Sequence, residues 1–296
     1  MTDADGPAGT LLAYPNVSEG RDAPAIAAIG AAFGPGLLDV HTDPDHHRSA
    51  YTLAGSPAGL PAAIRAGAQA AIARLTLDDH DGVHPRVGVL DVAPIVHVTP
   101  AQRGAAAASA LVLADLLGEL GLPVFLYGSL ADGRTRAQLR LGGPAGLAAR
   151  IASGEQRPDF GPGELHPTAG AVLVAARPPL IAFNVELAPG VPLDRARAVA
   201  AAIRESGAEG LPGVRAIGLW LAARDRAQVS TNIEDPDRVS PADVVAAVAR
   251  HAEVQEAELV GLAPAAAFAD FPATVPLRGL ATIEDALARH LARATA

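Results

Sequence analysis

The sequence predicts an α+β protein made of two units, each with the element order βαββαβ. Two observations support this prediction. Apolar runs of about four to eight residues, typical of strands, alternate with longer helical patterns. The same order of elements then occurs a second time along the 296 residues, as a repeat of pattern rather than of letters. We expect a boundary near Pro178, with units at 1–178 and 179–296.

Breaks in the apolar pattern mark the elements of the first unit. Gly34-Pro35-Gly36 ends a helical pattern, and Ser56-Pro57 is a good N-cap and first-turn pair for the next helix. The predicted elements are a strand at 11–14, a helix at 22–33, strands at 37–41 and 49–53, a helix from 56 to about 75, and a strand at 87–98. An Ala-rich helix at 101–120 and a short strand at 124–127 follow.

The second unit repeats this order after a long connection. Residues 130–170 are rich in Gly and Pro and contain one weak helical pattern, so this segment is long enough to be functional as well as connective. The elements predicted beyond it are a strand at 180–187, a helix at 193–205, strands at 214–221 and 228–233, a helix capped by Ser240-Pro241, and a strand at 257–262.

A βαββαβ unit of this split, ferredoxin-like type forms an antiparallel sheet with both helices on one face. The other face of the sheet is then free to meet a partner. The sequence therefore predicts a duplicated fold in which two ferredoxin-like subdomains place their sheets face to face, with the helices outside.

Composition excludes several kinds of site and partner. The chain has no cysteine, which rules out disulfides, thiolate zinc sites and a cysteine nucleophile. Its net charge is −9 and all 23 basic residues are arginine, which argues against nucleic acid as a partner. The acidic N-terminus lacks the features of a signal peptide, and no apolar run nears the roughly 20 residues of a membrane span. We expect a cytoplasmic protein.

Histidines crowd into one part of the chain, since six of the nine lie between His41 and His97. The stretch 41–48 mixes His and Asp and could hold a divalent ion or form a solvated turn. No helical H-x-x-x-H or H-E-x-x-H spacing supports the metal site. His80 and His84 fall in a loop between a helix and a strand, where Pro85 fixes the backbone. Either could be catalytic, or both could be hydrogen-bonded surface residues.

Strand periodicity predicts a polar sheet face in the second unit. Gln228 and Asn232 alternate with apolar residues in one strand, and Asn184 does so in another. If these side chains line the gap between stacked halves, they form an amide-rich pocket suited to an amino acid or a pterin head group. The alternative is a sheet face that meets solvent.

Six segments in order, between about positions 11 and 265, resemble the sequence blocks of the formiminotransferase family. The segments are Tyr14–Arg21, His84–Val92, Pro158–Pro162, Leu165–Ala171, Ile181–Val185 and Ala227–Asn232. The resemblance implies a duplicated α/β fold that binds its substrates in a channel between the halves. It also implies transfer of a formimino group from N-formimino-L-glutamate to N5 of tetrahydrofolate. The cyclodeaminase domain of vertebrate members has no room here, so the chain looks like a stand-alone bacterial form.

The resemblance implies roles for individual residues. His84 falls on the catalytic histidine of the family, and Arg48 falls on an arginine of its active-site region. His80 and Asp91 are candidates to orient His84, while Asn184, Gln228 and Asn232 are candidates to bind the donor. The folate-binding segment of the family maps to Gly161, Pro162, Gly163, Glu164, Leu165, His166, Pro167, Thr168, Ala169 and Gly170.

The same resemblance sets the expected partners. Tetrahydrofolate is a co-substrate, the transfer calls for no metal or nucleotide, and a homodimer is expected because dimers are common in the family. The composition leads us to expect neither nucleic acid nor a membrane as a partner. His41 stands where vertebrate members have Asp, and Ser129 stands where the family usually has Glu, which leaves the donor open. A relative acting on 5-formyltetrahydrofolate or another formimino donor, and a non-catalytic folate-binding protein, are the alternatives.

Overall fold

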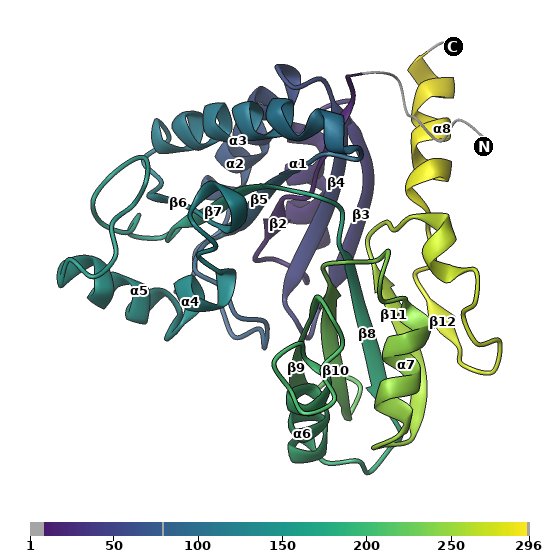
Figure 1. The fold of residues 1–296 in the computed structure, drawn as a ribbon. Helices are drawn as coiled ribbons and strands as arrows, with labels where there is room; N and C mark the ends of the chain where they lie inside the picture. Colours follow the sequence, from purple (N-terminus) through teal and green to yellow (C-terminus); the bar gives the residue numbers. More distant parts are fainter. Residues whose placement is uncertain (1–8, 79, 295–296) are drawn as a thin grey trace. The chain divides into compact units, whose positions relative to one another are not determined.

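The computed structural model describes residues 9–78 and 80–294, which form mixed α and β structure with two sheets (Figure 1). The chain divides into two compact units, Met1–Pro178 and Pro179–Ala296. In the described residues, a seven-stranded sheet lies in the first unit and a five-stranded sheet in the second.

The first unit begins with the predicted order of elements. These are β1 (Leu11–Ala13), β2 (Asn16–Val17), α1 (Ala23–Ala32), β3 (Leu37–Asp43), β4 (Arg48–Gly55), α2 (Gly59–Ile72) and β5 (Leu90–Val96). The first predicted strand corresponds to β1, and the short strand β2, which the sequence did not predict, follows Pro15, a residue with no N–H for the ladder. β4 lies between β3 and the β1–β2 pair, and β5 lies on the other side of that pair, all antiparallel.

The chain then adds elements that the sequence prediction did not fully include. They are η1 (Pro100–Gln102), α3 (Arg103–Gly118), β6 (Val124–Leu126), η2 (Gly128–Leu130), α4 (Arg136–Arg140), α5 (Gly143–Ala152) and β7 (Val172–Arg177). The connection holds two helices instead of one. The unpredicted strand, β7, pairs in parallel with both β5 and β6. Residues 172–176 are all buried, so the strand lacks the alternation that reveals a half-exposed strand.

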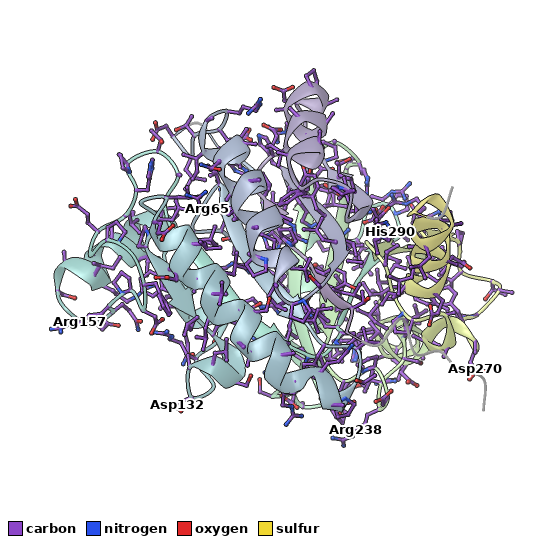
Figure 2. The ribbon with its side chains drawn as sticks, turned by 90° about the horizontal axis from the view of Figure 1, so that it is seen from above. Arg65, Asp132, Arg157, Arg238, Asp270 and His290 are labelled. Atoms are coloured by element: carbon purple, nitrogen blue, oxygen red, sulfur yellow. The ribbon has the colours of Figure 1, made fainter. Side chains whose placement is uncertain are left out.

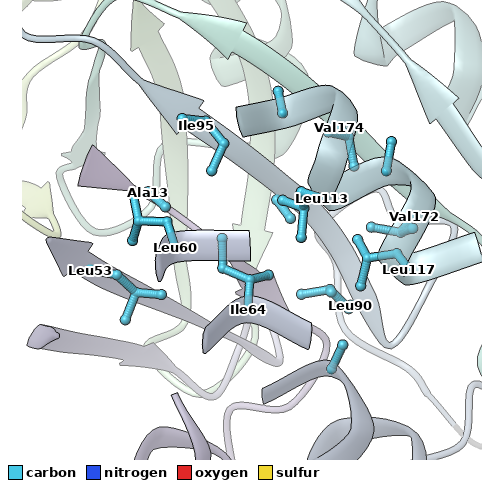
Figure 3. Packing of buried hydrophobic residues seen from close by; sticks show 14 of the residues in the cluster. Ala13, Leu53, Leu60, Ile64, Leu90, Ile95, Leu113, Leu117, Val172 and Val174 are labelled. Carbon is cyan, nitrogen blue, oxygen red and sulfur yellow. The ribbon is translucent and has the colours of Figure 1, made fainter. Parts of the chain in front are cut away.

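Helices cover both faces of this sheet. α1, α2 and α3 lie on one face, where Leu60, Ile64, Leu113 and Leu117 join the main cluster of buried side chains (Figure 3). Each fully buried side chain of this size stabilises the fold by about 1.5–3 kcal/mol. On the other face, Leu139 of α4 packs in a second cluster with strand residues. The expectation of a free sheet face is therefore wrong for the β5–β7–β6 end of the first unit.

The second unit also follows the predicted order. Its elements are β8 (Ile181–Leu187), α6 (Leu193–Ile203), β9 (Val214–Leu221), β10 (Arg226–Ile233), α7 (Pro241–Ala249) and β11 (Val254–Val260), with η3 (Ala265–Phe268), β12 (Leu277–Arg278) and α8 (Ile283–Ala294) behind them. The strand order is β12-β11-β8-β10-β9. Residues of α6 and α7 pack with Phe183 and Val229 in one cluster. Ser240 caps α7 through a reciprocal bond pair with Asp243, as predicted.

Charged side chains mark the outside of the molecule. Asp132 and Arg157 are exposed in the long connection of the first unit, and Figure 2 shows both at the edge of that unit. Among the described residues, no helix has both the length and the apolar character needed to cross a membrane.

Candidate active site

His84 is held in a loop that one arginine braces. The loop joins α2 to β5, and the guanidinium of Arg86 donates to three of its carbonyl oxygens. Nη1 of Arg86 lies 2.8 Å from the Gly82 oxygen and 3.3 Å from the His84 oxygen, and Nη2 donates to the His80 oxygen. These bonds tie the backbone that precedes Pro85 to the side chain that follows it. The loop therefore presents the imidazole from a rigid support.

The imidazole of His84 contacts the guanidinium of Arg48, the first residue of β4. Nη1 of Arg48 lies 2.7 Å from Nε2 of His84. Because a guanidinium can only donate, Nε2 must be the acceptor, and the ring proton must lie on Nδ1. Nδ1 is buried and has no partner in the described structure. The site thus holds one defined tautomer of a neutral histidine.

Burial and positive charge keep this histidine neutral. Desolvation is the largest cause that lowers the pKa of His84 well below its ordinary value, followed by the charges of Arg48, Arg140, His46 and Arg136. A neutral imidazole can accept a proton, provided that its lone pair is accessible. The electrostatics therefore suit a base rather than a permanent cation.

Three arginines gather at this histidine. Arg136 and Arg140 belong to α4, and their charges act on both His84 and Arg48. Burial lowers the pKa of Arg48 to about 10, and Arg140 adds to this effect while Asp91 opposes it. Nη2 of Arg140 donates to Oδ2 of Asp91. This arginine cluster, defined as Arg48, Arg136 and Arg140, creates a positive field that favours carboxylate ligands.

Asp91 and His80 make their bonds to other groups than the His84 ring. Asp91 is buried, and its Oδ1 accepts from the Val87 backbone N–H at 2.8 Å. Nε2 of His80 lies 2.9 Å from the His47 carbonyl oxygen, and the two rings stack with centroids 4.2 Å apart. Asp91 supports the backbone after His84 and neutralises Arg140, whereas His80 braces the loop against the β3–β4 turn.

The histidine-rich turn at 41–48 is organised by its own bonds. Oδ1 of Asp43 accepts from the His46 backbone N–H at 2.8 Å and lies 3.2 Å from Nδ1 of the same histidine. Nδ1 of His47 accepts from the Gly20 N–H at 3.1 Å. Within residues 9–78 and 80–294, no group of three potential ligands is arranged to hold a metal ion.

The segment from Gly161 to Gly170 lies beside the His84 loop. His166 and Gly170 exchange two backbone hydrogen bonds of 3.0 Å, which close a tight bend. The end of the segment pairs with the end of the His84 loop. Val89 N–H donates to the Ala169 oxygen, and the N–H of Ala171, just after the segment, donates to the Val87 oxygen, both at 2.9 Å. The backbone approach is so close that a Cβ on Gly88 would lie 1.8 Å from the Ala171 oxygen. The segment and the histidine therefore share one rigid frame.

The second unit carries the predicted polar sheet face. Gln228 of β10 pairs in register with Glu186 of β8, and Ser230 pairs with Asn184. Nδ2 of Asn184 donates to Oε2 of Glu258 at 3.1 Å. Gln228 is fully buried and both of its amide atoms lack a partner in the described residues.

Charged residues occupy the same face beside Gln228. Glu186 is buried and accepts from Arg224 and Arg278. Burial raises the pKa of Glu186, and the two guanidinium charges oppose that rise. Asn232 is half-buried opposite Ala182. The face thus combines amides and paired charges, a combination suited to a small polar ligand.

Sequence reasoning missed the contribution of α4. Residues 134–140 contain three arginines, of which Arg136 and Arg140 reach His84. The density of arginine was the available signal, but in a short helix it is equally typical of a solvated face. The packing of α4 on the sheet brings these side chains to the site.

Two successive parts of the chain match subdomains of one protein family. Residues 10–177 match the formiminotransferase domain, N-terminal subdomain, and residues 182–273 match the formiminotransferase domain. The chain is 34% identical over 269 residues to the glutamate formimidoyltransferase of Streptococcus pyogenes, with 86% of this chain and 89% of the relative covered. For the glutamate formimidoyltransferase of Thermoplasma acidophilum the identity is 32% over 271 residues, covering 86% and 88%.

Longer relatives match as well. The chain is 36% identical over 278 residues to the formimidoyltransferase-cyclodeaminase of Sus scrofa, with 86% of this chain covered. It spans 50% of the length of that relative. The two family matches together cover most of the chain, and the identity to stand-alone relatives exceeds 30% along nearly their whole length. This chain therefore belongs to the formiminotransferase family.

Proposed function

We propose that this protein transfers the formimino group of N-formimino-L-glutamate to N5 of tetrahydrofolate, yielding 5-formiminotetrahydrofolate and glutamate. Family membership and the names of the stand-alone relatives support this reaction. The observation that carries it is a neutral, half-buried His84 beside an arginine cluster. That pairing supplies a proton carrier next to groups that bind carboxylates.

The proposed chemistry needs one group that takes and then returns a proton. N5 of tetrahydrofolate attacks the amidine-like carbon of the donor, which forms a tetrahedral intermediate. His84 accepts the proton that N5 must lose and delivers it to the glutamate nitrogen as the carbon–nitrogen bond of the donor breaks. Atoms and charge balance without a metal, nucleotide or redox cofactor.

Binding roles follow from the same assignment. We assign the folate to the segment 161–170, which is anchored beside the His84 loop by the backbone bonds of Ala169 and Ala171. Asn184, Gln228 and Asn232 are assigned to the donor, because their amides can orient an amidine. Arg48 is assigned to a carboxylate. A homodimer remains a prediction of the family resemblance, and a cytoplasmic location remains a prediction of the sequence pattern.

The fold proposal is a duplicated ferredoxin-like architecture, with subdomains at 1–178 and 179–296. Its support is the strand order in the two sheets. Numbered within each βαββαβ unit, the four strands lie in the order 2-3-1-4, as β3-β4-β1-β5 in one unit and β9-β10-β8-β11 in the other. The additional strands β6, β7 and β12 extend the sheets at one edge.

The test is direct assay of purified protein with tetrahydrofolate and N-formimino-L-glutamate, comparing the natural chain with His84→Ala. Loss of a general acid–base group typically lowers turnover by about 10²- to 10⁴-fold, and we expect that range with little change in the dissociation constant of folate. His80→Ala is the control and should lower turnover roughly tenfold or less, since His80 only braces the loop.

The outcomes separate the alternatives. If His84→Ala is nearly silent while His80→Ala is severe, the proton-transfer role belongs elsewhere. If folate affinity falls in step with turnover, the role of His84 is structural. If product forms only from 5-formyltetrahydrofolate or from another formimino donor, this protein is a family member with a different substrate. Folate binding without turnover of any donor would identify a binding protein.

A further inference from the structure

We propose that Arg48 masks the base of the active site in the ligand-free protein, and that a substrate carboxylate unmasks His84 by drawing the guanidinium away. The inference rests on the proposed function, because it concerns how the same histidine becomes active. It makes Arg48 a positioning residue whose second role is to hold the carboxylate.

The masking follows from the hydrogen-bond inventory of a neutral imidazole. Such a ring has one donor and one acceptor nitrogen. Nη1 of Arg48, 2.7 Å from Nε2, occupies the acceptor of His84. The other nitrogen, Nδ1, carries the proton and is buried without a partner in the described residues. In this arrangement the ring has no lone pair available for a substrate proton, although a general base must offer one.

The groups around Arg48 favour its transfer from His84 to an incoming carboxylate. A guanidinium bonds more strongly to a carboxylate than to a neutral imidazole, because the bond is charge-assisted and can be bidentate. Arg140 and Arg136 repel Arg48, while Asp91 and Asp43 attract it. Asp91 also neutralises Arg140 directly. An incoming carboxylate adds the negative charge that this cluster of guanidiniums favours.

Unmasking also changes the proton affinity of His84. The charged or titratable groups that face the imidazole are Arg48 of β4, His46 of the β3–β4 turn, and Arg136 and Arg140 of α4, while Arg86 bonds to the His84 carbonyl oxygen. Neutralising Arg48 with a carboxylate weakens the largest of these charge effects. The base should therefore become both accessible and stronger when a carboxylate ligand is bound, which couples proton transfer to substrate binding.

Two ligands could supply the carboxylate, namely the amino-acid donor and the glutamate tail of the folate. NMR of protein labelled with ¹⁵N-histidine distinguishes them, with the His84 signals assigned by their loss in His84→Asn. Without ligand, we expect the Nδ1–H tautomer and no protonation near neutral pH. Saturating L-glutamate, tetrahydrofolate and the carboxylate-free 6-methyltetrahydropterin are then added separately.

The expected result is a rise of at least about tenfold in the proton affinity of His84 with one carboxylate ligand, and none with the pterin. A shift with L-glutamate alone assigns the carboxylate to the donor, and a shift with tetrahydrofolate alone assigns it to the folate tail. An Nε2–H tautomer in the free protein, a shift caused by the pterin, or no shift with either carboxylate ligand overturns the proposal.

Variants separate masking from a structural role. Arg48→Met should raise the proton affinity of His84 in the free protein and abolish its response to ligand. Arg48→Lys keeps the charge but lacks the planar guanidinium, so His84 should retain part of its response to ligand. This variant replaces Arg48→Met in the test if the Met variant fails to fold. Arg74→Met, an exposed position just after α2, is the matched control and should behave as the natural chain does. An unchanged His84 in a folded Arg48→Met protein contradicts the inference.

The NMR readout does not depend on turnover. If the transfer assay fails but glutamate still shifts His84, the masking stands and the proposed reaction is wrong. If transfer occurs while His84 is already unmasked in the free protein, the reaction stands and the masking is wrong.

Discussion

Replacing Asp91 by Asn should destabilise the first unit far more than a typical charge substitution. The Asp91 side chain is 1% exposed and that of Arg140 is 11% exposed, so the ion pair between them is largely shielded from solvent. The amide introduced by Asp91→Asn could still accept from the Val87 N–H through its carbonyl oxygen. Its NH₂ group, however, would turn donors toward the donors of Arg140.

The expected magnitude follows from the cost of leaving a buried charge without its partner. Removing one member of a buried pair typically costs about 3–5 kcal/mol of unfolding free energy. Here Arg48 and Arg136 lie close enough to add repulsion once the carboxylate is gone. The loss should therefore reach the upper part of that range.

Urea unfolding followed by circular dichroism measures the change, with the first and second units as separate transitions if the curve shows two. Asp194→Asn is the matched control, because Asp194 and Arg197 form a pair whose side chains are 92% and 63% exposed. An exposed pair of this kind contributes about 0.3–0.5 kcal/mol. Equal, small losses for both variants would refute the claim that burial makes the Asp91–Arg140 pair important for the stability of the first unit.

Two further predictions concern caps and pH. Ser240→Ala should lower the free energy of unfolding by about 1 kcal/mol, because it removes the acceptor of the Asp243 N–H at the start of α7. A Ser240→Thr control should be nearly neutral in the same urea experiment. Burial lowers the pKa of His80 to about 4, below its ordinary 6.5, so protons bind the unfolded chain first and stability falls as pH drops from about 6.5 to 4. His80→Gln should make the fall of the thermal midpoint across that window shallower, with the remaining fall due to other buried histidines such as His84. An unchanged slope would contradict the cause given.

The order of secondary structure was within reach of the sequence, because its signals are local. Gly34-Pro35-Gly36 lies between α1 and β3, and Ser240 caps α7 where the sequence predicts a cap. The alternation of Gln228 and Asn232 with apolar residues corresponds to a polar sheet face in the structure. Each of these signals depends on a few neighbouring residues and on the fixed periods of helix and strand.

β7 shows where local signals fail. Both faces of this strand are covered, so residues 172–176 form a continuous apolar run with no alternation. Such a run is compatible with a buried strand or a piece of buried helix, and its length alone does not decide between them. Only its parallel pairing with β5 and β6, far away in the sequence, establishes the strand.

The sequence by itself determined the classes of chemistry open to this protein: with no cysteine and no lysine, proton transfer falls largely to histidine or carboxylates, and anion binding largely to arginine. It also singled out His84 and Arg48. The tertiary structure decided that these two side chains meet although 36 residues separate them, and that Arg140 reaches Asp91 across 49 residues. Sheet pairing and the packing of α4 create those contacts, and neither is encoded in the spacing of nearby residues. The protonation state of His84 depends on the same contacts, because burial and neighbouring charge set a pKa only after the chain has folded.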